Sequence, residues 1–173
     1  MNERNNGLSL HDKALAVTAS MIKQAQETGM SLYQGGFLSP KNMKSGKPLI
    51  ELLIFFINLW IWYEAEDTDK KTFFDSLLFW TRHWLTDKDG AQMNKKAADE
   101  FFKLLETRSL EYVAFQKQNK THESYSFILG AKVLSNMIGR EQKDPLPIMH
   151  LWNSIQTYMK LIDDIWEKTK PSR

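Results

Sequence analysis

Residues 49–63 read LIELLIFFINLWIWY, an apolar run interrupted only by Glu51 and Asn58. At about 1.5 Å per residue, a helix of this stretch is about 22 Å long, shorter than the roughly 30 Å hydrocarbon core of a bilayer. The charged Glu51 inside the run also argues against a membrane span. Because apolar side chains cover every face, protein must surround the helix. We therefore predict a buried central helix over about residues 49–66.

Helix is favoured along the rest of the chain as well. The 173 residues include 20 Leu but only 3 Val, whereas strands require runs of β-branched residues in strict alternation. A chain of this length buries roughly 70% of the surface that its unfolded form exposes, which is enough for one self-sufficient core. We predict an all-α fold, a single-domain bundle of five to seven helices over residues 1–173, with neighbouring helices antiparallel where loops are short.

Helix-capping and helix-ending residues indicate where the first helices begin and end. Ser9 can cap a helix that runs to Thr28, with Gly29 just past its end. Residues 1–8 are expected to form a flexible tail. Residues 29–47 are expected to form a long loop, which a short helical turn starting at Ser39 and Pro40 can interrupt.

Apolar residues at helical spacing predict four further helices downstream. These cover about residues 67–85, 92–117, 121–139 and 145–168. Gly130 lies inside the third of them. It either permits close contact with a neighbouring helix or is simply tolerated at a cost of about 1 kcal/mol.

Composition and missing motifs exclude much enzyme chemistry. The absence of Cys excludes thiolate zinc sites, cysteine nucleophiles and disulfides, and the net charge of +2 does not indicate a polyanion-binding protein. The sequence contains no Glu-x-x-His, no His-Glu-x-x-His and no phosphate-binding glycine loop. We expect no cofactor, no metal, no nucleic-acid partner and no membrane association. The first ten residues lack a signal-peptide pattern, so a cytoplasmic location is expected.

The surplus of aromatic residues is the most unusual feature of the composition. The chain has 6 Trp, 10 Phe and 5 Tyr, concentrated in residues 55–63 and 73–84. Both segments are apolar over more than half of their circumference, and six helices can fully surround only one or two of their number. We therefore predict a non-enzymatic protein that acts through protein–protein contacts and forms a homodimer.

Two alternatives use the same helices differently. The first is a helical bundle that binds an apolar small molecule, with polar groups at the mouth of its pocket. The candidates for that cluster are Glu51, Asn58, Tyr63, Glu64 and His83. The second is a metal-dependent helical hydrolase, in which His83 would join acidic residues at positions 51, 64, 66 and 67.

Three lysines in the predicted loop form a further candidate. Lys41, Lys44 and Lys47 follow a Gly-Gly pair and could contact an anion or an acidic partner. Exposed loop lysines also serve simply to keep a surface solvated, so both interpretations stay open at this point.

Overall fold

The structure, a computed structural model, describes residues 9–62, 67–86, 95–119 and 125–167. These residues form seven helices and no strand, which confirms the all-α bundle. The helices are α1 (Leu10–Gln34), α2 (Pro40–Lys44), α3 (Lys47–Trp62), α4 (Asp67–Thr86), α5 (Lys95–Asn119), α6 (Tyr125–Ile138) and α7 (Pro145–Glu167). Within this part of the chain, no helix is both long and apolar enough to cross a membrane. The expected tail at residues 1–8 lies outside the described residues.

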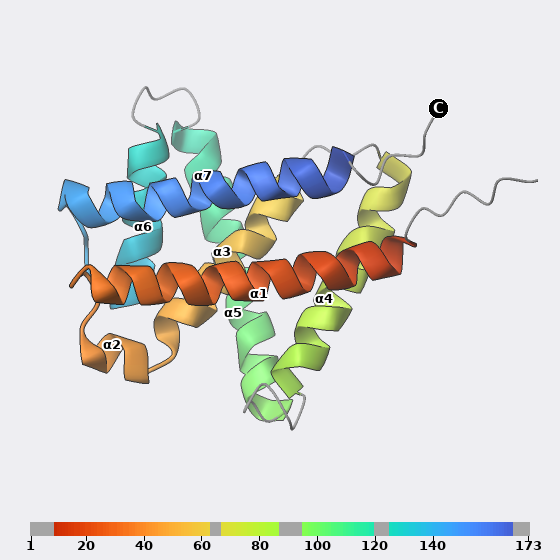
Figure 1. Cartoon of the computed structure of the whole chain (residues 1–173), viewed down its shortest axis with the longest axis horizontal. Helices are drawn as coiled ribbons and strands as arrows, with labels where there is room; N and C mark the ends of the chain where they lie inside the picture. Colours follow the sequence, from red (N-terminus) through yellow and green to blue (C-terminus); the bar gives the residue numbers. More distant parts are fainter. Residues whose placement is uncertain (1–8, 63–66, 87–94, 120–124, 168–173) are drawn as a thin grey trace, which may run out of the picture.

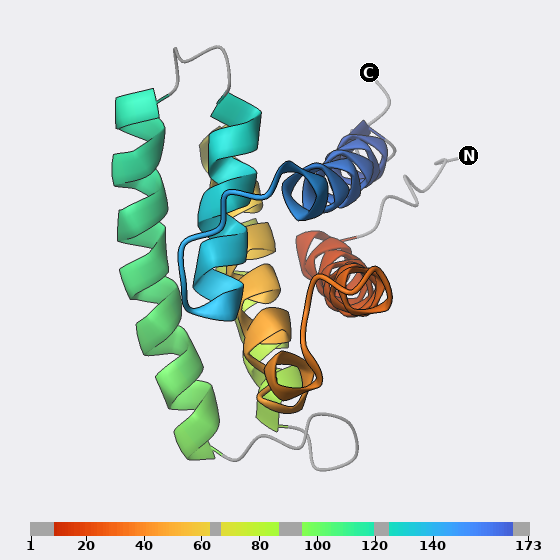
Figure 2. The ribbon, with the colours of Figure 1, turned by 90° about the vertical axis from the view of Figure 1, so that its left-hand side faces the viewer.

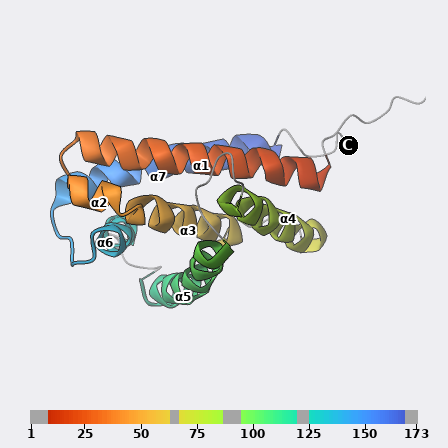
Figure 3. The ribbon, with the colours of Figure 1, turned by 90° about the horizontal axis from the view of Figure 1, so that it is seen from below.

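The helices lie in layers around α3. Helices α1 and α7 run antiparallel along one side of the bundle (Figure 1). Helix α5 lies on the opposite side, and α3, α4 and α6 lie between these two layers (Figures 2 and 3). Helix α3 packs against α1, α5 and α6, so it occupies the middle of the fold.

The central helix is enclosed, as the sequence predicts. Every residue from 51 to 60 is buried, including the polar Glu51 and Asn58. The Phe56 ring packs against Tyr158 of α7 at a centroid distance of 4.4 Å. A single copy of the chain therefore covers this stretch of α3 without help from a second subunit.

The first helix is longer than predicted. Ser9 caps it, because its Oγ accepts a hydrogen bond from the Asp12 amide at 3.2 Å. Gly29 does not end the helix, however, and α1 continues to Gln34. Leu32 lies in the added turn and is fully buried. Burial of this leucine outweighs the helix-ending tendency of a glycine, so the prediction of a stop at Gly29 was wrong.

Gly29 offers a simple test of this correction. A Cβ at this position would lie 3.8 Å from the Leu52 side chain, an ordinary contact distance. We expect Gly29→Ala to raise the free energy of unfolding by about 0.5 to 1 kcal/mol, because alanine loses less conformational freedom in a helix interior. Urea denaturation followed by circular dichroism measures the change. A loss of stability would contradict a helical Gly29.

The predicted loop over residues 29–47 is therefore partly helical: its first residues, up to Gln34, belong to α1, and Pro40–Lys44 form the predicted helical turn. Ser39 begins α2 with a capping box: its Oγ accepts from the Asn42 amide, and Asn42 Oδ1 accepts from the Ser39 amide. Gly46, at a φ of 67°, then turns the chain into α3. The left-handed backbone at this position favours glycine.

Gly130 permits a close approach between α6 and α7. A Cβ at position 130 would lie only 3.1 Å from the Ile148 side chain and 3.5 Å from the Ile148 carbonyl oxygen. Of the two interpretations of Gly130 offered above, the structure supports close helix contact. Gly139 then follows the end of α6 with a φ of 74°, as the sequence predicts for a helix stop.

Two buried tyrosines join helices that are distant in sequence. Trp60 Nε1 donates to the Tyr158 hydroxyl at 2.9 Å, which connects α3 to α7. Asn136 Nδ2 donates to the Tyr112 hydroxyl at 3.3 Å, which connects α6 to α5. Burial raises the pKa of Tyr112 and of Tyr158 well above the usual tyrosine value, because the ionised phenolate would lose its hydration.

These raised pKa values predict a loss of stability in alkali. Above about pH 10, Tyr158 ionises in the unfolded chain but keeps its proton in the folded one, so each rise in pH favours unfolding. Above about pH 10, the free energy of unfolding should therefore fall with pH less steeply in Tyr158→Phe than in the unmodified chain. We expect the two slopes to differ by about 1.4 kcal/mol per pH unit. Urea denaturation between about pH 9.5 and 11.5 gives both slopes. Equal slopes in the two proteins would contradict a raised pKa for Tyr158.

Candidate functional site

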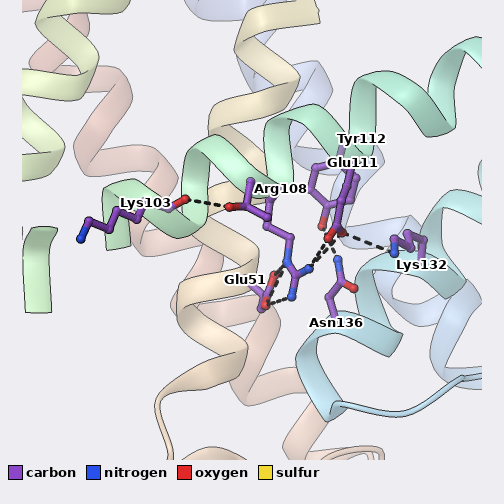
Figure 4. A network of polar contacts seen from close by, with 8 residues as sticks. Glu51, Lys103, Arg108, Glu111, Tyr112, Lys132 and Asn136 are labelled. Atoms are coloured by element: carbon purple, nitrogen blue, oxygen red, sulfur yellow. Dashed lines mark hydrogen bonds and ion pairs between the residues drawn. The ribbon is translucent and has the colours of Figure 1, made fainter. Parts of the chain in front are cut away.

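The most extensive polar contact in the described residues joins α3 to α5. Arg108 of α5 donates from Nη2 to Glu51 Oε1 at 2.9 Å and from Nε to Glu51 Oε2 at 3.0 Å (Figure 4). The Glu51 side chain is 1% exposed and the Arg108 side chain 18%. This is the two-pronged arginine–carboxylate geometry that suits a partly buried ion pair.

The same contact extends to α6. Arg108 Nη1 donates to Glu111 at 2.9 Å, and Lys132 Nζ lies 3.4 Å from Glu111 Oε2 (Figure 4). The Glu51–Arg108–Glu111–Lys132 network thus alternates in charge and sums to zero. Hydrogen bonding to Glu51 raises the pKa of Arg108 above its usual value, so Arg108 stays protonated.

This network serves the fold. Both Glu51 oxygens accept from Arg108, and the side chain has almost no contact with solvent. A carboxylate held in this way has its charge compensated and its lone pairs engaged, which leaves it poorly suited to bind a metal ion. The network instead positions α5 and α6 against α3.

Of the other members of the predicted polar cluster, Asn58 and His83 lie within the described residues, and neither belongs to the Glu51–Arg108–Glu111–Lys132 network. Asn58 is buried on α3 and donates from Nδ2 to the Ile54 carbonyl oxygen at 2.8 Å. Tyr63 and Glu64 lie outside the described residues, as does Glu66. Asp67 begins α4, but its side chain is also outside the described set. Among the residues that the structure describes, no group of three or more His, Asp or Glu could hold a metal ion.

A serine–histidine contact occurs between α1 and α7. Ser31 Oγ lies 2.6 Å from His150 Nε2, and the His150 ring packs against Phe37 at 5.7 Å. A nucleophilic serine also requires free N–H groups aimed at a developing oxyanion. Ser31 lies inside α1, where the amides donate to carbonyl oxygens of the preceding turn. This contact therefore fits a hydrogen bond that holds the two helices together.

The three candidate lysines do not share one orientation. Lys41 and Lys44 are exposed on α2. Lys47 is half-buried, and its Nζ lies 3.2 Å from the position that a Cβ on Gly139 would take. This places the charge of Lys47 at the carboxyl end of α6, where the helix dipole favours a cation.

His83, the last candidate, lies on a surface that α1 and α4 build together. Its ring stacks parallel to Phe79 at 6.5 Å and lies edge-on to Trp80 at 5.7 Å. His11, at the start of α1, packs against the same two rings at 5.8 and 4.9 Å, and its carbonyl accepts from Trp80 Nε1. Leu15 follows His11 by one helical turn. We call His11, Leu15, Phe79, Trp80 and His83 the aromatic–histidine surface.

This surface combines apolar exposure with charge at its edge. Phe79 is 56% exposed and Leu15 43%. Asp75 and Arg82 are exposed on the same helix, one turn before and one turn after Phe79. Arg82 is held by Asp99 of α5 at 2.9 Å, and its guanidinium lies 4.7 Å from the Phe102 ring. An apolar centre with a polar rim is the usual anatomy of a protein–protein interface.

Comparison with known proteins identifies no relative: no family model, no curated protein and no solved structure matches the chain. The chemistry of its own residues is therefore the basis for a functional proposal.

Proposed function

We propose that this chain is a cytoplasmic helical protein that acts through protein–protein contacts and associates with itself through the aromatic–histidine surface. The observation that carries the proposal is the 56% exposure of Phe79 beside two histidine rings and Trp80. A phenyl ring exposed to water gains free energy when a second apolar surface covers it. The neighbouring rings are already packed against each other, so little side-chain entropy is lost on association.

Other exposed apolar side chains support this choice less well. Leu110 is 70% exposed on α5, but the neighbouring positions 107 to 109 and 111 are polar or charged. Met30 and Met149 are exposed on α1 and α7, and both are flexible side chains that lose more rotamer freedom than Phe when they are fixed. The aromatic–histidine surface, in contrast, combines rigid rings with a polar rim.

Replacement of Phe79 tests the proposal. We expect the unmodified chain to sediment as a mixture of the 20.2 kDa species and a dimer of twice that mass. Phe79→Ser should weaken dimerisation at least tenfold, which corresponds to about 1.4 kcal/mol, while leaving the helical circular dichroism spectrum unchanged. Sedimentation equilibrium at concentrations up to roughly 200 µM covers the affinity range of a small interface.

Leu110→Ser is the matched control. It removes a side chain that is even more exposed, but from α5, and should leave the dimer fraction as it is in the unmodified chain. Two outcomes would overturn the proposal: the 20.2 kDa species alone at every concentration, or equal weakening by the two substitutions.

A further inference from the structure

We draw no further inference here: the strongest candidate, the exposed face of α4 around Phe79, carries nothing beyond the self-association proposed above, because nothing in the structure shows what covers it.

Discussion

Replacement of Arg108 by alanine is expected to lower the free energy of unfolding by about 3 kcal/mol, because it leaves a carboxylate in the core without its partner. Glu51 is 1% exposed, and Arg108 donates hydrogen bonds to both of its oxygens. A domain of ordinary stability has about 5 to 15 kcal/mol in total, so the loss will be a large fraction of it. Urea denaturation gives the value from the midpoint and slope of the transition.

Two further variants separate the free-energy cost of burying an unpaired charge from the net contribution of the ion pair to stability. Glu111→Gln removes the other carboxylate bound to Arg108, but its side chain is 35% exposed, so we expect a loss below about 1 kcal/mol. Combining Glu51→Leu with Arg108→Met removes both charges, and we expect it to be at least 1 kcal/mol more stable than Arg108→Ala alone. If Arg108→Ala changes stability by less than 1 kcal/mol, the buried pair does not hold α5 against α3.

Replacement of Phe56 by alanine is expected to lower the free energy of unfolding by about 3 to 5 kcal/mol. The side chain is fully buried, and its ring packs on Tyr158 at 4.4 Å. Its removal therefore opens a cavity between α3 and α7 and also removes a ring contact. Thermal and urea denaturation both measure this loss.

Leu110→Ala is the matched control for this cavity. Leu110 is also a large apolar residue within a helix, but it is 70% exposed, so its truncation should change stability by no more than about 0.5 kcal/mol. Similar losses from the two substitutions would show that Phe56 is not enclosed in solution, which would overturn the arrangement of helices around α3.

The elements that the sequence predicts well are those set by local chemistry. An apolar run covering every helical face can only be buried, and residues 51–60 are buried without exception. Ser9 and Ser39 have side chains that bond nearby amides, so both helix starts could be identified within a few residues. Gly139 has a positive φ, which allowed the end of α6 to be recognised from the glycine itself.

The features that the sequence did not predict depend on distant partners. Arg108 lies 57 residues from Glu51, and no spacing rule connects the two positions. The helical conformation of Gly29 depends on packing of the turn that follows it, including the buried Leu32. Phe73, Leu77, Trp80 and Trp84 recur at helical spacing in the sequence, and this stripe marks the side of α4 on which Phe73 and Leu77 are buried. By exclusion from that stripe, Phe79 could have been recognised as outward-facing, and this signal was overlooked.

The hydrogen bond between Trp60 and Tyr158 has a consequence for how the chain acquires its structure during translation. The two residues are 98 positions apart, and Phe56 packs on the same tyrosine. Synthesis proceeds from the amino terminus, so α3 leaves the ribosome long before α7 exists to cover it. During that interval α3, the most hydrophobic segment of the nascent chain, remains partly exposed. It is therefore the region that chaperones would have to protect from aggregation.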